Sequence, residues 1–367
     1  MKRLESLDAL RGFDMFFIMG GAGLIVSIAN CFPESTFWHT IATQMNHVEW
    51  KGLRHHDTIF PLFLFIAGIS FPFSLERQRS AGKSTREIYA KILRRGITLV
   101  LLGMIYNNLL TLNFNEVRFC SVLGRIGVAW MFAAMIYTIT KKHTLQCGIT
   151  AGILVTYWLI MALIPAPDYP DADIFSKEGS IACYIDRIIL GASHMYKPIY
   201  EPEGLLSNIP AIATALIGMM SGAWIKEKQR MSGTKKALVL VAAGIVLALI
   251  GWAWSHVFPI NKALWSSSFV CAVAGYSLIM LALFYYIIDV RGWRKWAHAF
   301  VVIGMNSITI YMAQRFIAFG TTSHRLLDGL ASILPEQAGA IVYHTGYILI
   351  CWLFLYFLYK KKVFLRI

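Results

Sequence analysis

The chain has 367 residues, of which 57% are hydrophobic and only 15% are charged, and its formal net charge is +14. A soluble globular domain is typically about 45–50% apolar and about 25% charged, so this composition excludes an ordinary soluble domain and predicts a membrane protein. The positive charge does not indicate nucleic acid as a partner, because the lysines and arginines form short clusters beside apolar stretches, as juxtamembrane anchors do.

Ten apolar stretches are each about long enough to cross a bilayer, which takes about 20 residues in a helix. Backbone groups in hydrocarbon must pair within their own segment, and no run alternates with period two, so we predict an all-α, polytopic helical bundle. We expect a single membrane domain over residues 1–367. The predicted spans are 8–29, 58–75, 96–112, 121–140, 147–165, 208–225, 237–255, 266–288, 297–318 and 339–359.

The basic residues predict the orientation of the chain in the membrane. Most of the 34 lysines and arginines fall on one alternate set of loops, and loops rich in these residues stay in the cytoplasm. We therefore predict that both termini are cytoplasmic and that the number of crossings is even. The first stretch is kept as a spanning helix rather than a cleaved signal, because it is long and carries Asp8, Arg11 and Asp14.

Two loops are long enough to carry structure of their own, and the cysteines bear on metal binding and disulfides. The basic loop 76–95 is expected to form a short surface helix, and the loop 166–207 is the longest outward connection, which predicts a partly folded or functional segment. The six cysteines show no zinc-binding spacing, and we expect no metal site. A disulfide among Cys31, Cys120 and Cys183 on the outer side is left open.

The first outward loop holds the most informative polar residues. His47 is a candidate general base, because imidazole titrates near neutral pH. Asp57 begins the second span, and a carboxylate bonded to one ring nitrogen would fix the tautomer and leave the other nitrogen to act. The alternative is that His47, His55 and His56 are interfacial histidines near Trp50. A metal shared by His55, His56 and Asp57 is disfavoured, because adjacent residues on a helix point apart.

Two further outward loops carry candidates for substrate binding. Glu203 lies in a Pro-Glu-Gly turn at the mouth of the sixth span, where a carboxylate could bind a sugar hydroxyl or an ammonium. Asn261, Lys262 and Trp265 lie in a short loop near membrane depth and resemble a contact for carbohydrate or for an acyl carbonyl. The alternatives are a solvated acid at position 203 and a lysine that only extends to the membrane surface.

Several polar residues are expected at membrane depth, where ionisable groups are costly unless they have partners or a watery path. Asp8 and Arg11 are three residues apart and can pair on one helix face. Arg11, Arg95 and Arg125 would place cations through the bundle, which suits an anionic ligand such as a phosphate-bearing cofactor. The alternative for these arginines is that they extend to the surface. Asn306 lies within the ninth span.

Together these motifs give the chain a family resemblance over nearly its whole length. It resembles the heparan-alpha-glucosaminide N-acetyltransferase family and its bacterial relatives, and the order and spacing of the motifs carry the likeness. They are Leu7-Asp8-Ala9-Leu10-Arg11-Gly12, His47-Val48-Glu49-Trp50-Lys51-Gly52-Leu53 with Asp57 and Phe60-Pro61-Leu62-Phe63, Val122-Leu123-Gly124-Arg125-Ile126-Gly127-Val128, Pro202-Glu203-Gly204-Leu205-Leu206, Ile260-Asn261-Lys262-Ala263-Leu264-Trp265-Ser266 and Gly304-Met305-Asn306-Ser307.

The resemblance implies an enzyme that transfers an acetyl group across the membrane, from cytoplasmic acetyl-CoA to the amine of an amino sugar outside. It places the active-site histidine at His47 and a carboxylate at Asp57. It makes site candidates of Arg125, Glu203, Asn261, Lys262, Trp265 and Asn306. Trp50, within the His47 motif, is counted as a substrate-binding candidate. One departure is visible, since animal members carry an asparagine in the first span where this chain reads Phe17-Ile18-Met19-Gly20-Gly21.

The expected setting is the inner membrane of a bacterium, with the active face periplasmic and the bilayer and an amino-sugar acceptor as partners. A homodimer is left open. His47 would act as a general base or as a carrier of the acetyl group. Two other functions stay open: a transporter for a sugar or glycan fragment, and an O-acyltransferase for an envelope glycan. The lack of an internal repeat counts against the transporter.

Overall fold

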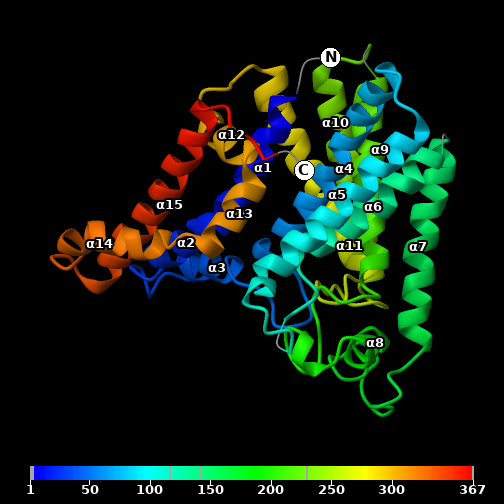
Figure 1. Ribbon diagram of the computed structural model, residues 1–367, viewed down its shortest axis with the longest axis horizontal. Helices are drawn as coiled ribbons and strands as arrows, with labels where there is room; N and C mark the ends of the chain where they lie inside the picture. Colours follow the sequence, from blue (N-terminus) through cyan, green and yellow to red (C-terminus); the bar gives the residue numbers. More distant parts are fainter. Residues whose placement is uncertain (1–3, 116, 141, 229, 366–367) are drawn as a thin grey trace. The chain divides into compact units, whose positions relative to one another are not determined.

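The computed structural model describes residues 4–115, 117–140, 142–228 and 230–365 (Figure 1). Within these ranges it is helical and holds no strand, only an isolated bridge between Pro165 and Ser180, so the all-α prediction is confirmed. The elements in chain order are α1 (Glu5–Phe16), η1 (Phe17–Gly21), α2 (Ala22–Ala29), α3 (Thr36–Gln44), α4 (His55–Ser80), α5 (Thr85–Tyr106), η2 (Leu109–Thr111), α6 (Val122–Ile139), α7 (His143–Leu163), α8 (Ile181–Ile189), η3 (Ala192–His194), α9 (Asn208–Glu227), α10 (Gly233–Trp254), α11 (Ser267–Phe284), η4 (Tyr285–Val290), α12 (His298–Met305), α13 (Ser307–Phe316), α14 (Phe319–Ala331) and α15 (Glu336–Lys360).

Among the described residues, 8 helices are long and apolar enough to cross a membrane, which makes this a multi-pass membrane protein. Each of them overlaps one of the ten predicted spans. They are Glu5–Ala29, His55–Ser80, Val122–Ile139, His143–Leu163, Asn208–Glu227, Gly233–Trp254, Ser267–Val290 and Glu336–Lys360.

The other two predicted spans, 96–112 and 297–318, take different forms. The expected surface helix of the loop 76–95 is continuous with the first of them, because α5 starts at a Ser84–Glu87 capping box and runs to Tyr106. Its amino-terminal half therefore carries four of the basic residues of that loop, Arg86, Lys91, Arg94 and Arg95. The second is divided at Asn306, whose φ of −130° ends α12 before α13 begins. The number of crossings stays a prediction.

The chain divides into two compact units. Unit 1 comprises the described residues within 1–48, 54–59 and 280–366. Its central pair is α1 and α12, which lie side by side (Figure 1). They meet at Gly12 and Gly304: a Cβ on Gly12 would lie 1.7 Å from the Phe300 carbonyl oxygen, and one on Gly304 would lie 1.9 Å from that of Asp8. Only glycine allows the two backbones to approach so closely.

The first span of unit 1 is not a uniform α-helix. Residues Phe17–Gly21 form the π-helix η1 between α1 and α2, and Gly20 has a φ of +111°. This conformation is open to glycine and strained for other residues. The helices α2, α14 and α15 pack around the same region, with α15 against both α2 and η1.

Unit 2 comprises the described residues within 49–53 and 60–279. Its helices pack as α5 on α6, α6 on α9, and α7 on α9. The long loop 166–207 is partly folded, as expected, since it contains α8 and η3. It covers a buried apolar cluster in which Tyr157 and Phe258 are fully enclosed, and the Tyr157 hydroxyl donates to the Leu264 carbonyl at 2.6 Å. We call the loop 166–207 the cap of unit 2, and it carries the candidate residue Glu203.

Candidate active site

In unit 1, His47 and Asp57 lie in contact. The Nδ1 atom of His47 is 2.7 Å from Oδ1 of Asp57. The Asp57 side chain is only 1% exposed, whereas that of His47 is 53% exposed. A buried carboxylate therefore holds an imidazole that can still meet a ligand.

Local backbone contacts fix the carboxylate of Asp57. Its Oδ2 accepts hydrogen bonds from the backbone N–H groups of Val48, at 3.3 Å, and Arg54, at 3.2 Å. The Arg54 side chain donates to the carbonyl of His47 at 3.0 Å. Asp57 lies in the first turn of α4, and its bond to the N–H of Arg54, the residue before the helix, is the contact that the third helical residue makes in a capping box. The segment before α4 is thus folded back onto its own first turn.

This arrangement determines the chemistry open to His47. A carboxylate only accepts hydrogen bonds, so Nδ1 carries the shared proton and Nε2 carries the basic lone pair. The negative charge of Asp57 also stabilises the ring once Nε2 is protonated. The pair can therefore act as a base supported by a carboxylate, with the histidine in the exposed position.

Residues 49–53 of the motif belong to unit 2 and contact two of its loops. The Trp50 indole donates to the Phe175 carbonyl at 2.7 Å, and its ring lies 5.2 Å from that of Tyr200. Gly52 has a φ of +123°, and its N–H donates to the Ile260 carbonyl at 2.8 Å. Trp50 thus joins the segment 49–53 to the loop 166–207, and Gly52 joins it to the loop before α11.

The predicted site residue Glu203 belongs to a buried ion cluster with Arg118 and Glu201. Arg118 donates to both carboxylates, and its Nε is 2.9 Å from Glu201 Oε2. Glu201 also accepts from the backbone N–H groups of Glu203 at 3.0 Å and Tyr196 at 2.8 Å. The sequence did not single out Arg118, because it lies 83 and 85 positions from its two partners and no local pattern marks it.

The two carboxyl groups of this cluster differ in acidity. Burial disfavours charge on Glu201, but the hydrogen bond and the positive charge of Arg118 hold its pKa below the usual value. Burial dominates at Glu203 and raises the pKa, against the attraction of Arg118 and Arg125. Two adjacent carboxyls with pKa values moved in opposite directions are typical of functional sites.

The guanidinium of Arg125 lies close to this cluster and is 2% exposed. Its Nη2 donates to the Ser207 hydroxyl and to the Gly204 carbonyl, and its charge lies 4.8 Å from the centre of the Trp265 ring. Its Nε and Nη1 atoms have no hydrogen-bond partner among the described residues. Buried donors left open in this way are suited to an anion or a carbonyl oxygen of a bound ligand.

The loop that carries Asn261, Lys262 and Trp265 is a tight turn with a strained residue. The Asn261 side chain is 1% exposed; its Oδ1 accepts from the Leu264 N–H at 2.9 Å, and its Nδ2 has no partner among the described residues. Trp265 is fully buried, has a φ of +50°, and donates to the Thr214 hydroxyl at 3.1 Å. A bulky residue in this region of φ costs free energy and often marks a functional site. The positive charge of Lys262 opposes the rise that burial causes in the pKa of Glu203.

Three further candidates have partners within their own units. Arg11 pairs with Asp8 at 3.4 Å, as the spacing predicted, and lies on α1 of unit 1. Arg95 of unit 2 stacks over the Trp130 ring at 4.2 Å. Asn306 donates to the Val363 carbonyl at 3.0 Å, so its amide holds the segment that follows α15.

Asp186 is a buried carboxyl that the sequence did not identify as a site residue. Its Oδ1 accepts from the Leu205 N–H at 2.8 Å, and a Cβ on Gly204 would lie 1.9 Å from its Oδ2. Asp186 therefore supports the turn whose Gly204 carbonyl and Ser207 hydroxyl hold Arg125. Burial raises the pKa of Asp186 to about 7, although the Leu205 hydrogen bond opposes the change.

From this raised pKa we predict how the stability of the protein depends on pH. The folded chain holds a proton on Asp186 up to about pH 7, whereas the unfolded carboxyl loses it near 3.8, so folding takes up a proton between these values. The contribution of Asp186 to stability is therefore expected to fall as pH rises from about 4 to about 7 and to stay level above that. Asp186→Asn has no such proton. The melting temperature of the wild type minus that of the variant should be larger at about pH 4.5 than at about pH 8; an equal difference would contradict the assignment.

Comparison with known proteins places the chain in a family. Residues 3–253 match the family model described as "Heparan-alpha-glucosaminide N-acetyltransferase, catalytic". The chain belongs to this family. The matched range includes His47, Asp57, Arg118, Arg125 and Glu203.

Two curated members align over the whole chain. The heparan-alpha-glucosaminide N-acetyltransferase of Homo sapiens is 28% identical over 420 aligned residues, covering 100% of this chain and 60% of the human protein. The Mus musculus protein of the same name is 28% identical over 418 residues, with 100% and 61% covered. The chain thus spans about three fifths of the length of these relatives. Asn261, Lys262, Trp265 and Asn306 lie beyond the family-model match but within these alignments.

The departure from the family pattern in the first span has a structural counterpart. The stretch Phe17–Gly21, which has no amide side chain, is the π-helix η1. π-Helical turns inside α-helices are often found at functional sites. The phenyl ring of Phe17 also contacts the ring of His55, eight positions beyond His47, with their centres 4.6 Å apart. This segment is therefore part of the same unit and the same region as the His47–Asp57 pair.

Proposed function

We propose that the chain is a transmembrane acyltransferase that moves an acetyl group from acetyl-CoA to the amine of an amino sugar. The observation that carries the proposal is the contact between the exposed His47 and the buried Asp57 in a member of an N-acetyltransferase family. The direction of transfer follows the predicted orientation, from a cytoplasmic donor to a periplasmic acceptor across a bacterial inner membrane.

His47 would hold and move the proton of the reaction. An amino sugar arrives as an ammonium ion and must lose a proton before its nitrogen can attack a carbonyl carbon. Nε2 of His47 takes that proton, and Asp57 stabilises the charged ring through Nδ1. The new C–N bond forms as the C–S bond of the thioester breaks, and the nitrogen loses a second proton to give the neutral amide. Of the two protons that leave the nitrogen, one is passed by His47 to the sulfur and the other is released to water. Acetyl transfer through His47 itself is the alternative route.

The buried donors of unit 2 fit the polar groups of the donor substrate. Acetyl-CoA supplies an activated acetyl thioester, whose carbonyl oxygen and phosphates accept hydrogen bonds. Arg125 Nε and Nη1 and Asn261 Nδ2 are donors without partners among the described residues, so they suit such acceptors. We assign Arg125 and Asn261 to this role, together with Lys262. Arg11 and Arg95 are proposed to contribute to the attraction of the phosphates.

The acidic residues suit the other substrate. Glu203 and Trp50 are proposed to contact the amino sugar, with Trp265 and Asn306 as further candidates. A carboxylate attracts an ammonium group, and an aromatic ring packs against the apolar face of a sugar. No role for nucleic acid is proposed.

The proposal is tested by incubating purified protein with labelled acetyl-CoA and glucosamine. The expected product is a labelled amide, formed only when protein and both substrates are present. A labelled ester would instead favour an O-acyltransferase. Uptake of sugar into vesicles without any acetyl-CoA would favour a transporter, and either result would contradict the proposal.

A further inference from the structure

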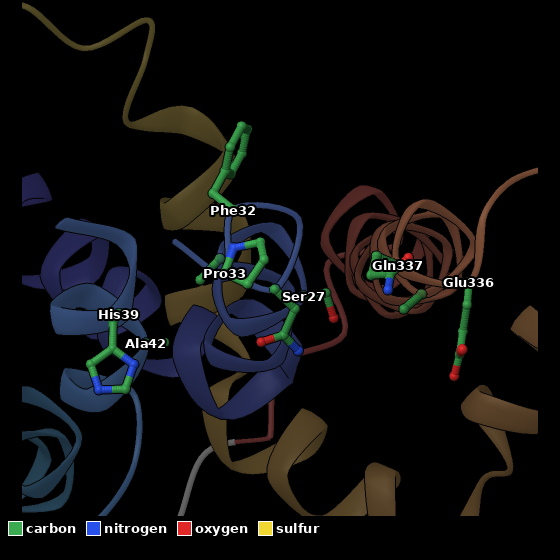
Figure 2. A pocket seen from close by; sticks show the side chains of 10 residues that line it. Ser27, Phe32, Pro33, His39, Ala42, Glu336 and Gln337 are labelled. Carbon is green, nitrogen blue, oxygen red and sulfur yellow. The ribbon is translucent and has the colours of Figure 1, made fainter. Parts of the chain in front are cut away.

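Two cavities adjoin along one side of α15, within unit 1. The first has a volume of about 530 Å³ and lies between α15 and the α2–α3 segment, and Figure 2 shows side chains from both walls. The second has a volume of about 500 Å³ and lies between α15, α14 and η1. Ala340 lines both. We call the two cavities together the α15 groove.

The face of α15 that lines the groove is unusual for a membrane helix. Its lining positions recur about every three or four residues, which places them on one face. That face would normally be a packing seam of small or apolar residues. Here it is largely polar, and polar side chains on a spanning helix are retained where they line a cavity. The lining residues of α15 are Glu336, Gln337, Ala340, Tyr343, His344 and Tyr347.

The opposite walls add hydrogen-bonding groups and an ordered ring. Ser27, Asn30 and His39 line the first cavity. Phe32 also lines it, and its ring is stacked on that of Trp38 with centres 5.5 Å apart. Ser323 and His324 line the second cavity, where the His324 ring lies 4.0 Å from that of Tyr343. The groove therefore offers hydroxyl, amide and imidazole groups together with aromatic faces along its length.

The charge of the lining narrows the choice of ligand. Glu336 is its one carboxylate, and no lysine or arginine is among the described residues that line either cavity. An elongated ligand rich in hydroxyl groups fits these walls, provided that it is uncharged or carries amines. Sulfate or carboxylate groups would be brought beside Glu336 with no cation in the lining to balance them.

The groove is also close to His47 along the chain. Ala42 lines the first cavity and precedes His47 by five residues. A chain of five residues reaches at most about 17 Å, so a ligand of a few sugar rings could extend from the groove toward the imidazole.

We propose that the α15 groove binds the sugar units next to the amino sugar that is acetylated, so that the acceptor is an oligosaccharide of uncharged or amine-bearing sugars. The link to acetylation rests on the proposed function. The binding itself does not require catalysis and can be measured separately.

The test compares glucosamine with its β-1,4-linked trimer as acceptors for the purified protein. If the groove adds a few hydrogen bonds, kcat/KM for the trimer should exceed that for glucosamine by about tenfold or more. Glu336→Lys should bring this ratio close to one, because it places a cation against an amine-bearing ligand. The matched control is Asp171→Lys, an equal charge change at an exposed loop residue of unit 2, and it should leave the ratio unchanged.

Calorimetric titration with the trimer gives a second readout that does not depend on activity. Binding to the wild type, weakened about tenfold by Glu336→Lys and not by Asp171→Lys, supports the groove even if no sugar is acetylated, in which case only the proposed function fails. A wild-type ratio near one together with no trimer binding overturns the proposal. Equal affinity for a sulfated oligosaccharide of the same length overturns the assignment of ligand charge.

Discussion

Replacing His47 by alanine is expected to abolish acetyl transfer, lowering the rate by about 10²–10⁴-fold, because a positioned general base typically contributes that much. The effect should fall on kcat/KM for the amino sugar. Labelled amide formation by purified protein measures it. Since the His47 side chain is about half exposed, the protein level and the melting temperature should stay close to those of the wild type.

Two other variants sharpen this experiment. His256→Ala removes an exposed histidine of unit 2 and should leave the rate unchanged. Asp57→Asn keeps the shape of the partner but removes the charge that stabilises protonated His47, so a large loss of activity is expected there as well. Full activity in His47→Ala would refute the assignment of this residue as base or carrier.

Replacing Arg118 by alanine is expected to destabilise the protein by about 3–5 kcal/mol, because it leaves two buried carboxyl groups without their cation. The side chains of Glu201 and Glu203 are 0% and 9% exposed, and that of Arg118 is 23% exposed. Thermal unfolding in detergent, followed by tryptophan fluorescence, should show a melting temperature lower by several degrees.

The matched control is an exposed ion pair of the same unit. Lys51 and Asp173 are 2.6 Å apart, but their side chains are 45% and 51% exposed. Such pairs contribute about 0–1 kcal/mol, so Lys51→Ala should change the melting temperature little. Adding Glu201→Gln and Glu203→Gln to Arg118→Ala should restore part of the loss, since neutral amides are less costly to bury. Equal shifts in Arg118→Ala and Lys51→Ala would show that burial of the cluster is unimportant.

Features that depend on nearby residues could be predicted from the sequence. The pairing of Asp8 with Arg11 follows from helical spacing, and the contact of His47 with Asp57 needs only that the short segment between them folds back. The apolar stretches predicted the spanning helices because insertion in a bilayer depends on local composition.

Features that depend on distant residues could not be predicted. Arg118 and its two partners are far apart in sequence, and a single arginine in an outward loop looks the same whether it is solvated or buried. In the sequence Asp186 is one of several acidic residues of a long loop, and only the structure shows that it is buried beside Gly204. The α15 groove could not be predicted either, because its polar residues are spaced along a helix whose composition is that of an ordinary apolar span.

The division of the predicted span 297–318 at Asn306 could not be predicted for a different reason. The sequence 297–318 is apolar enough to predict one helix, and an asparagine within it reads as a polar residue at membrane depth. Its amide instead bonds to the Val363 carbonyl at 3.0 Å, and α12 ends where this contact forms. A tertiary contact therefore overrides the local preference for a continuous helix.

The close approach of α1 and α12 at Gly12 and Gly304 limits the substitutions that can accumulate at these two positions. Each residue already sits against a backbone oxygen of the facing helix, 1.7 Å and 1.9 Å from where a methyl group would be added. No single substitution at either position is tolerated without moving a whole helix, and no second change of side chain can compensate, since the obstacle is main chain. A library that randomises the first helix should therefore return glycine at position 12 among the survivors, whatever activity is selected.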